Sequence, residues 1–307
     1  MSPTIRTLIA AARPWSFSAS LGPFAVGAQL AYKWNGRFSV GAAALAAVCV
    51  VAVHAGANLV NTHCDYVNGV DGPTSADRTL VDGRLDVRQV WLSAVVAYVA
   101  SFVVFVALLL LPSSSIAGDP HRVVADEILL VVLYVGGVLA GVGYTAGPRF
   151  KYVAAGDAVV YVAFGPTTVL FAYVTQTSAA DAWTAAGPLL AHAAPLAFTV
   201  EAILHANNVR DADADRRAGV RTLVDVIGPT GSRWLFAALL ALPFACSAAT
   251  AIVWRSPSYL VPLVGAPTAV GCVRRYSNGR LVGLPDAVAA LNLQLAVAYV
   301  CAIAFDD

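Results

Sequence analysis

Charged residues are scarce in this sequence. Only 12% of its 307 residues are Asp, Glu, Lys or Arg, whereas soluble proteins contain about 25%. Hydrophobic residues make up 59% of the chain, and the mean hydropathy is +0.72. This composition excludes an ordinary soluble domain and predicts an all-α, polytopic membrane protein.

A large net charge and a basic tail are also absent. The formal net charge is +1, so there is no electrostatic reason to expect a nucleic-acid partner. The cysteines form no CxxC pair, and we expect free thiols that fill apolar space rather than disulfides or metal ligands. The N-terminal segment shows no small-residue cleavage site, so no cleaved signal peptide is expected.

Hydrophobic runs recur along the chain, and about 20 apolar residues suffice to cross the hydrocarbon layer of a bilayer. We predict one domain, residues 1–307, with nine transmembrane helices near 15–32, 40–63, 90–111, 128–146, 153–175, 186–206, 234–254, 258–273 and 286–305. This arrangement puts fifteen Lys and Arg residues on the side of the N-terminus and four on the other. The bias predicts a cytosolic N-terminus.

The few charged residues concentrate in two segments that follow hydrophobic runs on the predicted cytosolic side. Residues 207–225, NNVRDADADRRAGVRTLVD, carry eight charges in nineteen positions. Residues 61–82, NTHCDYVNGVDGPTSADRTLVD, end in the same five letters. A solvated loop needs no repeated pattern of Asn and Asp, so we interpret the two segments as one functional unit used twice.

The second segment places its polar residues at helical spacing. Asn207, Asp211 and Asp215 stand at i, i+4 and i+8, on one face of a helix that continues past the sixth span. The D-x-D-x-D pattern is also typical of an EF-hand, but that loop requires Gly at its sixth position and Glu at its twelfth. The chain has Arg216 and Thr222 there, so we reject a calcium loop.

The first segment, near 58–82, repeats the spacing only in part. Asn61 and Asp65 are again four residues apart, but the next acid is Asp71, six residues on. We predict a helix break near Gly69 that returns Asp71 towards Asp65.

Clustered carboxylates at a membrane surface repel one another unless cations lie between them. Hard oxygen donors suit Mg²⁺, which typically binds one or two carboxylates together with phosphate oxygens and water. We predict two Mg²⁺ ions bridging a diphosphate, with these ligands: Asp65, Asp71, Asp211, Asp215, Asn61 and Asn207.

Basic residues beside the acids predict the diphosphate site, because guanidinium and ammonium groups bind phosphate oxygens. A third element, YTAGPRFKYVAAGD at 144–157, adds Tyr144 and Lys151 on the same side. The predicted diphosphate-binding residues are Asn61, Asn207, Arg210, Arg216, Lys151 and Arg13. We expect the intramembrane histidines to be packing residues and Asp82 and Asp225 to be structural, and we leave the role of Asn58 open.

At these residues the sequence resembles the UbiA superfamily of intramembrane prenyltransferases, and its animal branch above all. The resemblance is carried by RPWSFSASL, AGANLVNTHCDYVNGVD, DRTLVD, YTAGPRFKYVAAGD, FGP at 164–166 and EAILHANNVRDADADRRAG. Many microbial members have an acid where this chain has Gly69. The displaced acid, Asp71, is typical of the animal branch.

The resemblance implies a nine-helix bundle with a cytosolic cap and a cavity open sideways to lipid. It implies Mg²⁺-dependent transfer of a prenyl group from an isoprenyl diphosphate, geranylgeranyl diphosphate in the animal branch, to menadiol, a reduced quinone, which gives menaquinone-4. Lys151 and Tyr144 would act on the diphosphate, and Asp65 or Asp71 would accept the proton of the acceptor. The animal branch implies the endoplasmic reticulum or Golgi membrane, with a mitochondrial membrane as the alternative.

Other functions remain open at this stage. Another aromatic acceptor, such as 4-hydroxybenzoate in ubiquinone synthesis, would meet a related site. An ion-coupled transporter is the non-enzyme alternative, although its acids should lie near the bilayer midplane. A CDP-alcohol phosphotransferase requires D-G-x-x-A-R, and the match begun by Asp71 and Gly72 fails at Ser75 and Ala76.

Overall fold

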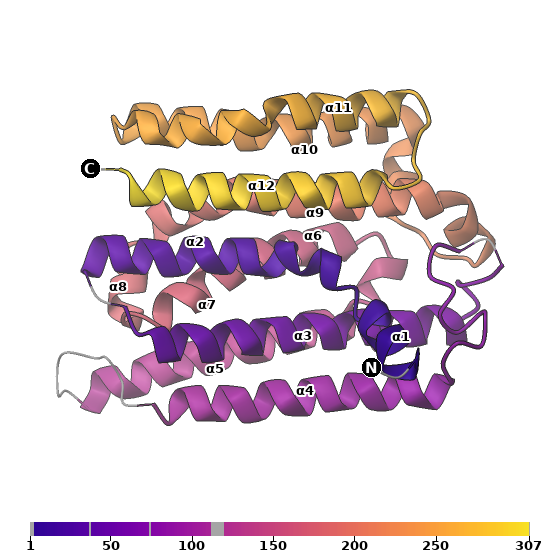
Figure 1. Cartoon of the computed structure of the whole chain (residues 1–307), viewed down its shortest axis with the longest axis horizontal. Helices are drawn as coiled ribbons and strands as arrows, with labels where there is room; N and C mark the ends of the chain where they lie inside the picture. Colours follow the sequence, from indigo (N-terminus) through magenta and orange to yellow (C-terminus); the bar gives the residue numbers. More distant parts are fainter. Residues whose placement is uncertain (1–2, 37, 74, 112–119, 307) are drawn as a thin grey trace.

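The computed structural model describes residues 3–36, 38–73, 75–111 and 120–306 and forms a bundle of long helices (Figure 1). Within these ranges there is no β-strand, only an isolated bridge between Val153 and Arg221. The all-α prediction is confirmed.

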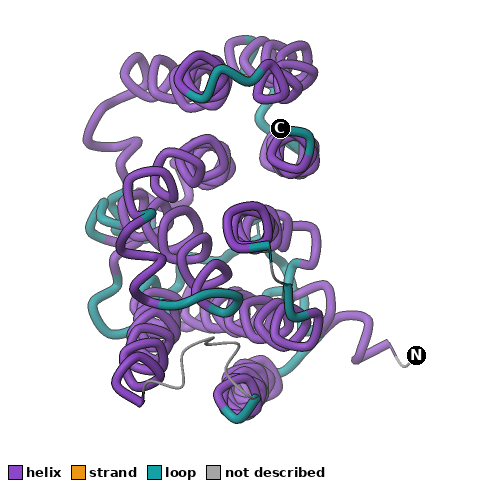
Figure 2. Tube along the Cα trace, turned by 90° about the vertical axis from the view of Figure 1, so that its left-hand side faces the viewer, coloured by secondary structure: helices purple, strands orange, loops and turns teal. Residues whose placement is uncertain are grey.

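The long helices run along the bundle, and a long loop, residues 68–86, joins two of them at one end (Figures 1 and 2). The long ones are α2 (Ser18–Asn35), α3 (Val40–Val67), α4 (Val87–Leu109), α5 (Pro120–Gly143), α9 (Ala186–Arg217), α10 (Leu223–Val253) and α12 (Leu284–Ala304). Shorter elements are α1 (Pro3–Ala11), η1 (Pro14–Phe17), η2 (Phe150–Tyr152), α6 (Gly156–Val162), η3 (Ala163–Thr167), α7 (Thr168–Val174), α8 (Ala179–Thr184), η4 (Pro257–Gly265) and α11 (Ala266–Ser277).

Seven helical segments of the described chain are long and apolar enough to cross a membrane, so the predicted count of nine is not confirmed. The two other predicted spans correspond to α2 and to η4 with α11, which lie alongside the rest in Figure 1. Polar residues at the end of α2, such as Lys33 and Asn35, lower its hydropathy. Pro257 and Pro262 fall in a 3₁₀ segment, which divides the eighth span into two shorter helices.

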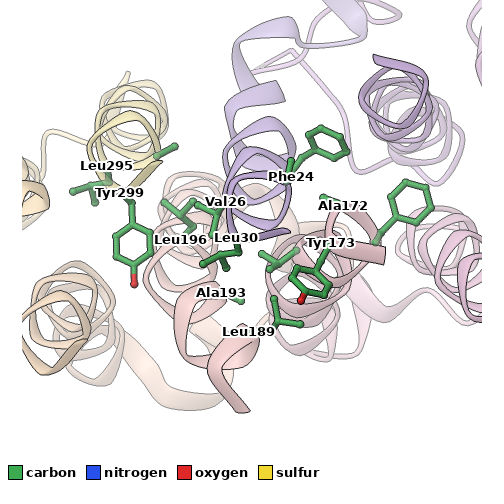
Figure 3. Packing of buried hydrophobic residues seen from close by; sticks show 14 of the residues in the cluster. Phe24, Val26, Leu30, Ala172, Tyr173, Leu189, Ala193, Leu196, Leu295 and Tyr299 are labelled. Carbon is green, nitrogen blue, oxygen red and sulfur yellow. The ribbon is translucent and has the colours of Figure 1, made fainter. Parts of the chain in front are cut away.

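The core is built around α2, which packs against α7, α9 and α12. Figure 3 shows Val26 and Leu30 of α2 beside Leu196 of α9, and all three are almost completely buried. Gly27 permits the approach to α7, because a Cβ at this position would lie 2.2 Å from the carbonyl oxygen of Val169. Backbone contact of this kind is typical of small residues between membrane helices.

The outward faces of the peripheral helices are apolar. Val96, Phe102 and Val103 of α4 are more than half exposed, as are Ile128 and Leu139 of α5. Such a surface is suited to lipid rather than water. By contrast, the loop after α3 and the end of α9 lie at the same end of the bundle, away from the C-terminus (Figure 1), so the fold brings the two charged segments to one side.

Candidate active site

A cavity of about 980 Å³ opens at the end of the bundle where the two charged segments lie. Its walls come from α2, α3, α5, α6, α7 and α9, and its mouth from the loop after α3. Among the predicted site residues, those that line it are Arg13, Asn61, Asp65, Asp71, Tyr144, Lys151, Asn207, Arg210, Asp211 and Asp215. Two polypeptide segments about 150 positions apart therefore contribute to one cavity.

The first acidic cluster, here called the first clamp, consists of Asn61, Asp65 and Asp71 and forms where α3 ends. Gly69 adopts a left-handed φ of +71°, a conformation that costs glycine little. The chain then turns back, and the backbone N–H groups of Val70 and Asp71 both donate to the carbonyl oxygen of Asp65, at 2.8 and 3.1 Å. The predicted helix break and the return of Asp71 towards Asp65 are confirmed.

Asp65 is buried, and each of its carboxylate oxygens has a donor. The Lys151 ammonium lies 2.6 Å from Oδ2, the Tyr152 hydroxyl donates to Oδ1 at 2.8 Å, and Asn61 donates to Oδ2 at 2.9 Å. Burial opposes the charge of Lys151, but the carboxylates of Asp65 and Asp215 prevail and raise its pKa above the ordinary value. Lys151 therefore carries a stable positive charge inside the cavity.

Asp71 and Asp77 lie close together in the loop, but their pKa values differ. Burial, with the neighbouring Asp65 and Asp77 carboxylates, raises the pKa of Asp71 to about 7. Burial also opposes ionisation of Asp77, yet the Arg13 guanidinium, 3.0 Å away, helps to hold its pKa at about 2. Arg13 also donates to Asn61 at 3.1 Å, so it ties the loop to α3. Asp77 was not predicted, although its place directly before the repeated RTLVD was a signal.

The second clamp lies on α9, which continues as predicted to Arg217. Asp215 is almost completely buried, and Asp211 makes a two-point ion pair with Arg210 at 2.8 and 2.7 Å. Tyr144 lines the cavity between the clamps, and burial raises its pKa well above 10, so its hydroxyl remains protonated.

Each clamp is followed by a backbone turn of the same kind, and these two turns show which residues of the two repeated segments correspond. Gly219 has a φ of +74°, and the N–H of Val220 donates to the carbonyl of Asp215 at 2.9 Å, as Gly69 and Val70 do after Asp65. Asp65 therefore corresponds to Asp215, whereas the Asn–Asp spacing in the sequence matched Asp65 with Asp211. The seven residues 71–77, inserted before RTLVD in the first copy, supply Asp71 and Asp77.

Arg216 is not brought to the cavity. It is half exposed and pairs with Asp213 at 2.9 Å and with Asp225 at 2.6 Å. Asp225 also caps α10 through the backbone N–H of Thr222, which confirms its structural assignment. Asp82 is likewise structural and pairs with two arginines of its own loop.

The oxygen donors of the two clamps fit a hard divalent cation. Within the described residues, no three Asp, Glu, His or Cys side chains converge closely enough to hold an ion by themselves. A cation here would take the remaining ligands from its substrate or from water, as Mg²⁺ commonly does.

A family model described as the UbiA prenyltransferase family matches residues 20–292. The chain belongs to the UbiA prenyltransferase family. It is therefore a multi-pass membrane enzyme that transfers prenyl groups. It is 41% identical to the UbiA prenyltransferase domain-containing protein 1 homolog of Drosophila melanogaster, over 97% of this chain and 79% of the fly protein. It is 39% identical to the human UbiA prenyltransferase domain-containing protein 1, over 96% and 82% of the two chains.

Solved structures of archaeal UbiA homologues share the fold. An apo structure from Aeropyrum pernix K1 superposes with a TM-score of 0.65 at 17% identity and covers 92% of this chain and 96% of the archaeal one. A homologue from Archaeoglobus fulgidus, bound to GPP and Mg²⁺, superposes with a TM-score of 0.56 at 18% identity and covers 97% and 99%.

Proposed function

We propose that this enzyme transfers a geranylgeranyl group from geranylgeranyl diphosphate to menadiol in a Mg²⁺-dependent reaction that yields menaquinone-4. The observation that carries the proposal is the meeting of both Asp clamps and Lys151 at the mouth of one cavity whose deeper walls are apolar. An isoprenyl diphosphate has the same two parts, a charged head and a hydrocarbon tail.

The relatives support the metal and the donor. The archaeal homologue has been solved with GPP and Mg²⁺ and with DMAPP and Mg²⁺. In this chain the proposed ligands are Asp65, Asp71, Asp211, Asp215, Asn61 and Asn207, with phosphate oxygens completing the coordination. Bound Mg²⁺ would supply Lewis-acid stabilisation of the negative charge on the departing diphosphate.

The protein's own side chains stabilise the leaving group, accept the proton and exclude water. Lys151 and Arg210 line the cavity beside the clamps and provide fixed positive charge as the bond to the diphosphate breaks. Asp65 or Asp71 accepts the proton lost by the acceptor. The apolar walls exclude water, which would otherwise capture the prenyl cation as an alcohol.

The length of the tail and the cellular location belong to the same proposal. The part of the cavity away from its mouth is lined by apolar side chains such as Val50, Leu133 and Phe171, which offer a hydrocarbon surface to a long prenyl tail. We assign the mouth to the cytosolic face, following the bias of basic residues. From the resemblance to the animal branch of the family we assign the enzyme to the endoplasmic reticulum or Golgi membrane, with a mitochondrial membrane as the alternative.

The test compares Asp211→Ala with Asp213→Ala. Asp213 lies on the same helix but its side chain is 84% exposed and does not line the cavity, so it is a matched control for loss of one negative charge. Purified proteins receive labelled geranylgeranyl diphosphate, Mg²⁺ and menadiol, and the products are identified by mass.

We expect Asp213→Ala to retain turnover and Asp211→Ala to lose at least about 100-fold, since a charge that acts on the transition state is removed. Prenyl transfer by Asp211→Ala at the wild-type rate would disprove the role of the clamp.

A further inference from the structure

Farther from the mouth than the first clamp, the cavity contains a second group of polar side chains. Ser16, Ser20, His54 and Asn58, here called the polar shelf, all line the cavity. His54 and Asn58 lie on the same face of α3 as Asn61 and Asp65, at i, i+4, i+7 and i+11. Asn58 is therefore about 10 Å along the helix from Asp65, at 1.5 Å per residue.

The shelf is held together by its own hydrogen bonds. The two ring nitrogens of His54 lie 3.2 Å from the hydroxyl of Ser16 and 3.0 Å from that of Ser20. The amide nitrogen of Asn58 donates to the Ala12 carbonyl at 2.9 Å and to the Ser16 hydroxyl at 3.1 Å. These contacts fix the orientation of the Asn58 amide.

This orientation leaves one group of the shelf without a partner. Both amide hydrogens of Asn58 are used, and no donor from the described residues reaches its Oδ1. Asn58 is only partly buried and borders the cavity, so its oxygen is available to a ligand there. An amide oxygen accepts a hydrogen bond from a hydroxyl, but gives nothing to a quinone carbonyl.

The groups around the polar shelf favour an uncharged aromatic ligand. Phe164 borders the cavity and lies edge-to-face with His54, with ring centroids 4.8 Å apart. Every Lys or Arg that lines the cavity in the described structure belongs to the mouth: Arg13, Arg78, Arg84, Lys151 and Arg210. Arg13 is the nearest of them, since the Ser16 hydroxyl donates to its carbonyl, but its guanidinium already binds Asn61 and Asp77 at 3.1 and 3.0 Å. A carboxylate on the acceptor would lose its hydration beside the shelf and would have to compete with Asp77 for that positive charge.

We propose that the polar shelf binds the aromatic acceptor, and that it selects an uncharged hydroquinone whose hydroxyl donates to Oδ1 of Asn58 while its ring lies against Phe164. This inference rests on the proposed function and specifies how the acceptor is recognised. Its position below the clamp places the ring beside the end of the prenyl group that bears the diphosphate.

The experiment measures binding without turnover. The ligand is 2,3-dimethyl-1,4-naphthohydroquinone, in which methyl groups occupy the ring positions open to prenylation, kept reduced under anaerobic conditions. Its dimethyl ether is the matched ligand without hydroxyl donors. Both are titrated into detergent-solubilised wild type, Asn58→Leu, Phe164→Leu and Ser101→Ala. Ser101 is a buried, hydrogen-bonded serine of α4 that does not line the cavity.

We expect wild type and Ser101→Ala to bind the hydroquinone about five- to tenfold more tightly than the ether, the effect of one hydrogen bond. Asn58→Leu should bind both ligands equally, and Phe164→Leu should bind both more weakly with the preference unchanged. Affinity for geranylgeranyl diphosphate with Mg²⁺ should stay within about twofold in every variant, which also reports an intact fold. In competition, 4-hydroxybenzoate should displace the hydroquinone poorly.

Three results would disprove that the polar shelf binds the acceptor. They are no binding of the hydroquinone to wild type, equal binding of hydroquinone and ether to wild type, and an undiminished preference for the hydroquinone in Asn58→Leu. Displacement by 4-hydroxybenzoate at comparable concentration would overturn the selection for an uncharged acceptor. Hydroquinone binding with the expected preference, but no product from menadiol and geranylgeranyl diphosphate, would count against the proposed function. It would still support the polar shelf as a hydroquinone-binding site.

Discussion

Replacement of Lys151 by methionine tests the electrostatics of the cavity most directly. The Lys151 ammonium lies 2.6 Å from a carboxylate oxygen of Asp65, and both side chains are at least 86% buried. At an effective dielectric constant of about 20, the Coulomb attraction at this distance is about 6 kcal/mol. Tyr152 and Asn61 still donate to Asp65 in the variant, so part of the loss is offset. We expect the free energy of unfolding without Mg²⁺ to fall by about 3 kcal/mol.

Mg²⁺ should restore much of that stability, because a divalent cation at the clamp again compensates the Asp65 charge. The assay is equilibrium unfolding in detergent with and without Mg²⁺. Lys33→Met is the control, since Lys33 pairs with Asp306 at 3.0 Å outside the cavity, and its destabilisation should not respond to Mg²⁺. A loss below about 1 kcal/mol in Lys151→Met, or a loss that Mg²⁺ does not reduce, would refute this account of the site.

Three further outcomes follow from the structure. Gly27→Ala should lower the thermal midpoint by several degrees, because the added Cβ would lie 2.2 Å from a backbone oxygen of α7; an unchanged midpoint would show that the helices separate freely. Mg²⁺ affinity should fall about tenfold per unit below pH 7, since a proton competes at Asp71, whose pKa is about 7; Asp71→Asn should make that dependence clearly shallower, which Mg²⁺ titrations at pH 6 and pH 8 would check. Arg216→Ala should leave the KM for the diphosphate within about twofold, whereas Arg210→Ala should raise it about tenfold; equal effects would place both arginines at the substrate.

Much of the site could be predicted because its parts lie on helices or directly after them. Helical spacing put Asp211 and Asp215 on one face, and the Asn-Gly pair marked the turn after α3. The hydrophobic runs gave the helical class without any knowledge of packing. The count of nine spans is not confirmed, because polar residues at the end of α2 lower its hydropathy and the prolines of η4 shorten the regular helix in the eighth span.

Other features could not be predicted, most of them because they depend on contacts between distant segments. The partners of Arg216 are local, Asp213 and Asp225 at three and nine positions, but the sequence does not choose between these acids and a diphosphate. The link from Arg13 to Asp77 and the hydrogen bonds around His54 join residues 34 or more positions apart. His54 is hydrogen-bonded as expected, but its place in the cavity wall was not visible from an isolated histidine.

The ion pair between Lys151 and Asp65 matters while the polypeptide is still being synthesised. The first copy emerges from the ribosome long before the second, so Asp65 would enter the bilayer surface without the other half of the site. Lys151 also precedes α9 in the chain, and it lies against Asp65 in the finished structure. The first half of the polypeptide therefore carries its own counter-charge, and its acidic pocket does not need to wait for the second half to be neutralised.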